Sequence, residues 1–155
     1  MVAISKKNST PMELALQEAR LAFELDEVPV GAVIFHQGKL IAKAHNLTRH
    51  VFDPTGHAEI RAIRMACEAL SSERLPECDL YVTLEPCAMC AAAISFARIR
   101  RLYYGASDPK GGAVEYGPVF FNQPTCHHRP DIYLGLCEKE ASDLLTQFFS
   151  NKRKG

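Results

Sequence analysis

The sequence predicts an α/β fold, a three-layer α/β/α sandwich around a mixed five-stranded sheet. Residues 79–105 have the pattern of strand, helix and strand, a βαβ unit whose two strands are expected to be parallel. Residues 30–44 have the pattern of a hairpin, whose strands are antiparallel. The chain has 155 residues, which is suitable for a single domain, residues 1–155, with one core.

The first half of the chain begins with residues 1–9, which we expect to be a flexible leader. The segment Thr10-Pro11-Met12-Glu13 has the form of a capping box, so a helix is expected from here to about Asp26. The hairpin follows, and after it a loop over residues 47–56. The next segment, HAEIRAIRMACEAL (residues 57–70), has apolar residues at helical spacing, and Asp53 or Thr55 could cap this helix.

The second half of the chain contains the βαβ unit. Asp79 to Leu84 is an apolar run with β-branched and aromatic residues, typical of a buried strand, and Glu85-Pro86 ends it. The elements expected after it are a helix over residues 87–98, a strand over 101–105, a flexible loop over 105–117, a short apolar segment over 119–121, a fifth strand over 131–136, a helix from 138 to about 151, and a basic tail over 151–155.

Two cysteines and one histidine fall in the first turns of two predicted helices. Cys87 and Cys90 are three residues apart and therefore lie on one helix face, while His57 opens the other helix. One His, two Cys and an open fourth position form the ligand set of a catalytic zinc site rather than a closed structural one. Glu59 lies roughly 200° round the helix from His57, given 3.6 residues per turn, so it could lean over the open side of the ion.

The six cysteines also permit a disulfide framework. However, a CxxC motif within a helix of an intracellular chain is more often metal-binding, which favours zinc.

The segments HAE (57–59), TLEPCAMC (83–90) and SFARIRRLYYGASDPKGGAVE (95–115) carry a resemblance to a known family. Together they resemble the bacterial tRNA-specific adenosine deaminases, which make inosine at the wobble position and are a standard example of the zinc deaminases. The resemblance runs from about Met12 to Arg153 and implies a cytidine deaminase-like fold. One departure is Gly56, where the family more often has Ala.

The resemblance implies Zn²⁺ held by His57, Cys87 and Cys90, with a water in the fourth position. The ion would lower the pKa of this water toward about 7. Glu59 would take the proton of the water, pass it to the ring nitrogen and later protonate the departing amine, while hydroxide attacks C6 of adenine and ammonia leaves.

The resemblance also implies substrate contacts and partners. Asn46 would hydrogen-bond the flipped base, and the other residues expected to bind substrate are Ala58, Ala106, Asp108, Lys110 and Phe149. Taken alone, Asn46 and Asp108 are typical turn residues and Phe149 is typical of a core. The expected partners are the anticodon loop of a tRNA, in particular an arginine tRNA, and a second copy of the chain in a homodimer.

The formal net charge is zero, which argues weakly against a nucleic-acid partner. Basic residues nevertheless cluster at 98–101, 127–129 and 152–154, and beside a deaminase signature these clusters favour contact with phosphates. The alternative for each cluster is a solvated surface.

Two other functions are open. The same HxE and PCxxC core would serve a deaminase of a free base or nucleoside, such as guanine or cytosine. A zinc-stapled binding module without catalysis would require a fourth protein ligand, for which the candidates are Cys67, Cys78, Cys126 and His127.

No apolar run is long enough to span a membrane, and the start, MVAISKKNSTP, lacks the apolar segment of a secretory signal. The expected location is the cytoplasm.

Overall fold

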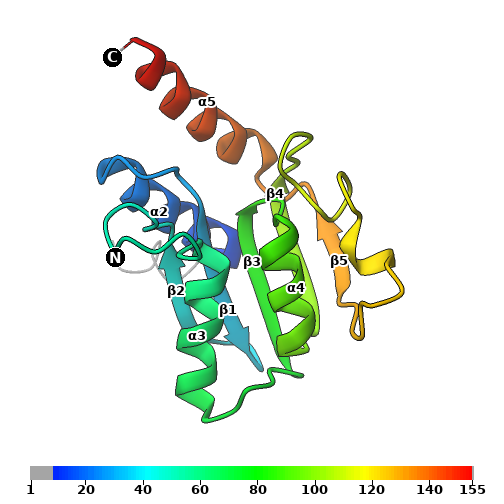
Figure 1. Cartoon of the computed structure of the whole chain (residues 1–155). Coiled ribbons are helices and arrows are strands. Elements are labelled where there is room, and N and C mark those ends of the chain that lie inside the picture. Colours follow the sequence, from blue (N-terminus) through cyan, green and yellow to red (C-terminus); the bar gives the residue numbers. More distant parts are fainter. Residues whose placement is uncertain (1–8, 155) are drawn as a thin grey trace.

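A five-stranded sheet forms the middle layer of the computed structural model, which describes residues 9–154 (Figure 1). The expected leader lies outside the described residues except for Ser9. The strands are arranged in the order β2-β1-β3-β4-β5. Their bounds are Gly31–His36 (β1), Lys39–His45 (β2), Cys78–Leu84 (β3), Arg101–Ala106 (β4) and Asp131–Leu134 (β5).

The sheet is mixed, as predicted. β1 pairs antiparallel with β2 and with β3, whereas β4 runs parallel to β3 and to β5. The hairpin and the parallel strands of the βαβ unit are therefore both confirmed. The start of β1 and the ends of β2, β3 and β4 consequently lie at the same end of the sheet, which is the end that carries the site described below.

Helices cover both faces of the sheet (Figure 1). α2 (Pro11–Glu24) packs on one face, and α3 (Ala58–Leu70) and α4 (Ala88–Ala97) pack on the other. α5 (Glu138–Lys154) starts beside β4, contacts α2 and runs along the end of the sheet at which β3 and β4 finish (Figure 1). The three-layer α/β/α architecture predicted from the sequence is thus confirmed.

α2 begins with the predicted capping box. The Thr10 N–H donates to Glu13 Oε1 (2.8 Å), and the Glu13 N–H donates to Thr10 Oγ1 (3.2 Å). This helix approaches β1 very closely at Gly31, where a Cβ atom would lie 2.0 Å from the Ala15 carbonyl oxygen. A residue without a side chain is therefore required for the first layer to pack on the sheet.

The strands divide their side chains between two cores. Ile34, Leu80 and Leu102 are fully buried on the face covered by α3 and α4. The opposite face carries an aromatic ladder, defined here as Phe35, Tyr81, Tyr103 and Tyr133, with ring centroids 5.9, 4.3 and 4.8 Å apart. The ladder crosses four strands and packs against the first turns of α2.

Several local expectations are wrong. Neither Asp53 nor Thr55 caps α3, whose N-cap is His57; instead Asp53 Oδ1 accepts hydrogen bonds from the backbone N–H and the hydroxyl of Thr55. β5 ends at Leu134 and not at Leu136, because Gly135 is left-handed. α5 continues to Lys154, so the basic tail is the last turn of a helix.

None of the helices within residues 9–154 is long and apolar enough to cross a lipid bilayer.

Candidate active site

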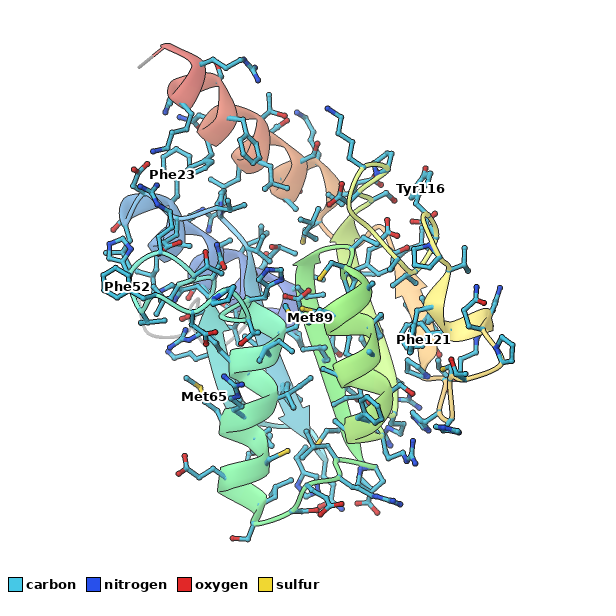
Figure 2. The ribbon with its side chains drawn as sticks, in the orientation of Figure 1. Phe23, Phe52, Met65, Met89, Tyr116 and Phe121 are labelled. Atoms are coloured by element: carbon cyan, nitrogen blue, oxygen red, sulfur yellow. The ribbon has the colours of Figure 1, made fainter. Side chains whose placement is uncertain are left out.

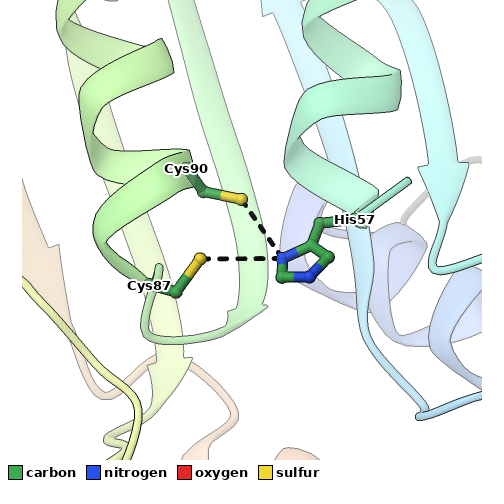
Figure 3. A group of neighbouring side chains, drawn as sticks. All are labelled: His57, Cys87 and Cys90. Carbon is green, nitrogen blue, oxygen red and sulfur yellow. Dashed lines mark hydrogen bonds between the residues drawn. The ribbon is translucent and has the colours of Figure 1, made fainter. Parts of the chain in front are cut away.

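Three potential metal ligands meet between the first turns of α3 and α4. His57 is the N-cap of α3, Cys87 is the N-cap of α4, and Cys90 lies in the first turn of α4. His57 Nδ1 lies 3.6 Å from Cys87 Sγ and 3.5 Å from Cys90 Sγ (Figure 3). The sequence prediction that these three residues come together is confirmed, since their ligand atoms all lie within 4.8 Å of one another.

These distances fit a tetrahedral zinc ion. With Zn–S near 2.3 Å and Zn–N near 2.0–2.1 Å, tetrahedral angles separate the nitrogen and sulfur ligand atoms by about 3.5 Å. Thiolate and imidazole are also the ligand types that zinc prefers. The side chains therefore already have the spacing of a zinc centre that holds three protein ligands and leaves one position open.

The local sequence explains why the ligands lie here. β3 ends at Leu84, and Pro86 separates it from α4, so Cys87 and Cys90 are presented beyond the carboxyl end of a strand. Both helices direct their first N–H groups and the positive ends of their dipoles at the same point. This electrostatic environment stabilises thiolates.

The two thiols hold their protons unequally. Hydrogen bonds from Cys90 and His57, against the effect of burial, lower the pKa of Cys87 to about 4. The proximity of Cys87 and burial raise the pKa of Cys90, and the hydrogen bond with Cys87 raises the pKa of His57. A divalent cation at this point would take the place of the remaining thiol proton, which is how metal binding releases protons from such a ligand set.

A buried carboxyl group, that of Glu59, lies beside this centre. Its residue is 4% exposed, and burial raises the pKa of Glu59 to about 7. A carboxyl group with a pKa near neutrality can both accept and donate a proton at physiological pH. A strongly shifted carboxyl in a cavity next to metal ligands is a typical feature of a catalytic site.

The centre forms the floor of a cavity of about 350 Å³. Of the residues predicted from the sequence, the cavity is lined by Asn46, His57, Ala58, Glu59, Cys87 and Asp108. Asn46 is buried; its Nδ2 donates to the Val28 carbonyl oxygen (3.4 Å), while its Oδ1 has no hydrogen-bond partner in the described part of the chain. A buried acceptor of this kind is available to an N–H donor of a ligand.

A second cavity, of about 810 Å³, adjoins the first and shares Val28, Leu84, Asp108 and Gly111 with it. It contains two further predicted residues, Lys110 and Phe149, and it also contains Lys152 and Arg153 from the end of α5. Phe149 is 45% exposed, so it belongs to this cavity rather than to the core.

Ala106 is placed differently. It is buried against Leu16 and Ala141 and lines neither cavity. Its contact with RNA stays a prediction.

The basic clusters lie at two different ends of the molecule. Arg100 and Arg101 lie at the start of β4, where both contact the Asp79 carboxylate, and His128 Nε2 donates to the Ile99 carbonyl oxygen (2.7 Å) close by. These two clusters are therefore at the end of the sheet opposite the metal ligands. The third cluster, at the end of α5, lines the second cavity.

Sequence reasoning missed several lining residues, among them Val28, Val30, Thr48, Leu84, Glu85 and Gly111. Most are apolar or small and carry no chemical signal. Glu85 is the exception, because it is an acidic residue that directly follows an apolar strand and lies two positions before Cys87.

A sheet of this topology with a His-Cys-Cys centre and a buried carboxyl group defines a metal-dependent deaminase. The model of the MafB19-like deaminase family matches residues 6–153. The chain is 69% identical to the tRNA-specific adenosine deaminase of Agrobacterium fabrum over 142 residues, which cover 92% of this chain and 93% of that protein. The corresponding enzyme of Rickettsia typhi is 50% identical over 144 residues, covering 92% of this chain and 97% of that protein.

Solved structures agree with these relatives. One, from a study of A-to-I editing by tRNA:A34 deaminases at the wobble position, has a TM-score of 0.86 and 69% identity and covers 87% of this chain and 98% of its own. The guanine deaminase of Bacillus subtilis has a TM-score of 0.63 and 30% identity, covering 93% of this chain and 94% of its own. The chain belongs to the tRNA-specific adenosine deaminase family, and the resemblance inferred from its motifs is confirmed.

Proposed function

We propose that this protein is a hydrolase that converts adenosine to inosine at the wobble position of a tRNA anticodon. One observation carries the proposal: the His-Cys-Cys group and a buried carboxyl group lie at a cavity of about 350 Å³, and the adjoining cavity carries three basic side chains. An adenine base flipped out of an anticodon loop would enter the cavity, while the flanking phosphates would meet Lys110, Lys152 and Arg153.

In this proposal, His57, Cys87 and Cys90 hold one Zn²⁺ per subunit. A bound Zn²⁺ supplies a Lewis acid that lowers the pKa of a coordinated water to about 7. The protein contributes three ligand side chains fixed at two helix N-termini, together with the cavity beside them.

Glu59 performs the proton transfers. Its carboxylate accepts one proton from the attacking water and passes it to the ring nitrogen. It then takes the second proton of that water, from the hydroxyl group now on C6, and gives it to the departing amino group. Because the carboxylate is regenerated after each transfer, one side chain serves both steps, and adenosine and water become inosine and ammonia.

The remaining site residues recognise the substrate. Asn46 supplies its unpaired Oδ1 to the base, and Ala58 contributes a small wall on the same floor. Asp108, Lys110 and Phe149 contact the RNA around the flipped nucleotide, with Phe149 available for stacking on a base. Ala106, which is buried behind this wall, would act through its packing.

The proposal includes a homodimer. The outward side of α4 carries four apolar residues at positions i, i+3, i+4 and i+7, namely Met89, Ala92, Ala93 and Phe96. Phe96 is 71% exposed, and Met89 can be seen in the first turn of the helix in Figure 2. No charged residue interrupts this helix from Ala88 to Ala97. A partly exposed apolar stripe of this kind favours contact with a second copy. A cytoplasmic location, where tRNA is available, also belongs to the proposal.

The alternative with structural support is a free-base deaminase, because a guanine deaminase has the same fold at 30% identity. The much higher identity to tRNA deaminases and the basic second cavity favour RNA. A purely structural zinc site is disfavoured because the single metal-ligand group found among residues 9–154 has three members and leaves one position open.

The experiment that tests the function is an inosine assay with purified protein of measured zinc content. The substrate is a transcript of an arginine tRNA with adenosine at the wobble position, and free adenine, adenosine, guanine and cytosine are assayed in parallel. The expected result is inosine at that position with the free compounds unchanged. Ammonia from a free base and no inosine in the tRNA would support the alternative instead.

A further inference from the structure

Glu85 is a buried carboxyl group that the reaction described above does not use. It lies between the last residue of β3 and the metal ligand Cys87, and it is 2% exposed. Its charge is met by backbone N–H groups. Oε1 accepts from the Asp108 N–H (2.8 Å), and Oε2 accepts from the N–H groups of Val114 (3.0 Å), Glu115 (2.9 Å) and Tyr116 (3.2 Å).

All four donors belong to the loop Ser107–Gly117, which follows β4. The carboxylate therefore fixes the loop at two places, at its first turn and at its return. Backbone N–H groups that converge on one carboxylate form strong, charge-assisted hydrogen bonds. The backbone adds a further connection, because the Ala113 N–H donates to the Pro86 carbonyl oxygen (2.9 Å).

The loop is shaped to accept this side chain. A Cβ atom at Gly112 would lie 2.4 Å from Glu85 Cδ and 2.6 Å from the Asp108 carbonyl oxygen. Only glycine at this position lets the loop fold round the carboxylate.

The part of the loop that Glu85 fixes is a wall of both cavities, through Asp108 and Gly111. Asp108 continues the connection, since its Oδ1 accepts from the N–H groups of Lys110 (3.2 Å) and Gly111 (3.0 Å). A chain of hydrogen bonds thus runs from the segment that carries Cys87, through Glu85 and Asp108, to the residues that face the substrate.

We propose that Glu85 is a positioning residue for substrate: its carboxylate holds the loop Ser107–Gly117 at a fixed distance from the metal ligands, so that the wall of the cavity is formed before RNA binds. The identity of the substrate in this statement rests on the proposed function. The positioning of the loop does not, and it can be measured separately.

The test compares Glu85→Gln with the wild type by hydrogen exchange and kinetics. Glutamine keeps the size of the side chain but replaces one acceptor oxygen with an NH₂ donor, which leaves at least one of the four backbone N–H groups without an acceptor. We expect faster exchange in the peptide 107–117, unchanged exchange in β3 and β4, and one zinc per chain. With a tRNA anticodon stem-loop as substrate, we expect KM to rise by a larger factor than kcat falls. The ratio kcat/KM should fall by about 100-fold, which is the effect of misplacing the substrate by roughly 1 Å.

Two further variants make the test specific. Gly112→Ala disturbs the same contact from the loop, because its methyl group would collide with the Glu85 carboxyl group. It should give the same exchange pattern and the same KM increase. Glu18→Gln is the matched control, because Glu18 is also a buried carboxyl group, paired with His45 (2.9 Å), but it lines neither cavity and contacts no part of this loop. It should leave exchange in 107–117 and KM at wild-type values.

The proposal is overturned if Glu85→Gln leaves exchange in 107–117 unchanged, or if exchange rises equally throughout the sheet, which would indicate a general stability role. It is also overturned if the loop loosens and KM does not move. If the wild type is inactive on tRNA, the proposed function fails, while the exchange data still decide whether Glu85 fixes the loop.

Discussion

Glu59 combines the two properties that acid–base catalysis at neutral pH requires, namely access to the metal centre and a pKa near 7. Burial is the principal cause of the raised pKa. The same burial implies that a charged carboxylate at this position is unfavourable for folding, which agrees with the proposed role of Glu59 in chemistry rather than in stability.

Replacing Glu59 by Ala or Gln should therefore separate activity from folding. We expect a loss of about 10⁴-fold in kcat, the upper end of what one acid–base group supplies, because in the proposed mechanism this group performs both transfers. Zinc content should stay at one ion per chain, and the melting temperature should be unchanged or higher. The measurements are inosine formation, metal analysis and thermal unfolding; a Glu59→Gln variant with a tenth of the wild-type kcat would refute the assignment.

A second buried carboxyl group, that of Glu27, has the opposite pKa shift. It is 1% exposed and accepts hydrogen bonds from the Arg49 N–H (3.1 Å), the His50 N–H (2.7 Å) and His50 Nδ1 (2.6 Å). Burial alone would raise the pKa of Glu27, but these hydrogen bonds hold it below its ordinary value of 4.5. Glu27 thereby ties the loop over residues 47–56 to the segment before β1.

This shift predicts how the stability contribution of Glu27 depends on pH. A carboxyl group whose pKa is lower in the folded state stabilises the protein above its unfolded-state pKa and loses this effect as pH falls through the folded-state pKa. Glu27→Gln should lower the unfolding free energy at pH 7 by about 1–3 kcal/mol. The difference in melting temperature from wild type should shrink as pH falls below 4.5, the ordinary value; a difference that stays constant as pH falls would contradict the prediction.

Among the elements, α5 lines the second cavity and also packs on α2. Phe148 packs edge-to-face on Phe23 of α2, with ring centroids 5.8 Å apart, and Lys152 donates to Asp26 (2.5 Å). Asp26 and Lys152 are both well exposed, so this ion pair contributes little to stability. Lys152 also lines the second cavity, where in the proposed function it would attract RNA phosphates.

The double variant Lys152→Ala/Arg153→Ala should change RNA binding and leave the fold intact. We expect a stability change below about 1 kcal/mol and a higher Kd for the anticodon stem-loop. The slope of log K against log salt should fall by about 1.5, the value for two lost phosphate contacts. The matched control is Lys139→Ala, at the start of the same helix and paired with Asp143, which should leave both binding and slope unchanged.

How far the elements could be predicted depends on where their signals lie. α2 was predictable because its capping box is written in adjacent residues, and α3 and α4 because their apolar residues recur at helical spacing. The end of α5 was not predictable, because residues 151–154 have neither a stop signal nor an apolar face. The contact that Lys152 makes there is with Asp26, which is 126 residues away in the chain.

The site shows the same division. Spacing and chemistry were sufficient to find His57, Cys87, Cys90 and Glu59, because these residue types occur together as metal ligands and a proton-transfer group. The role of Glu85 could not, since its partners are backbone N–H groups 23 to 31 residues away, and a backbone group leaves no mark on the sequence. For the same reason, the sequence alone could not show that two of the three basic clusters lie at the wrong end of the sheet for the cavity.

At the scale of the whole molecule, the outward side of α4 is the apolar surface that a partner would cover. Phe96 is its most exposed side chain, and it makes little contribution to the core. The assembly can therefore be tested with a change that does not alter the fold.

Phe96→Glu should convert a dimer into a monomer, because it places a charge in the centre of an apolar contact. Sedimentation at micromolar protein should give the mass of two chains for the wild type and of one chain for the variant, with the melting temperature of the isolated chain unaltered. A wild type with the mass of one chain, or a variant with the mass of two, would contradict the dimer.

The aromatic ladder has a consequence for how the protein can be observed. The chain contains no tryptophan and five tyrosines, and three of these five stack across β3, β4 and β5, with Tyr81 and Tyr103 parallel to within 4°. Stacked rings couple their electronic transitions, so the near-ultraviolet circular dichroism should be dominated by the ladder. This signal exists only while the three parallel strands are in register. The parallel half of the sheet thus has a built-in optical probe, which can be followed during unfolding separately from the helical signal in the far ultraviolet.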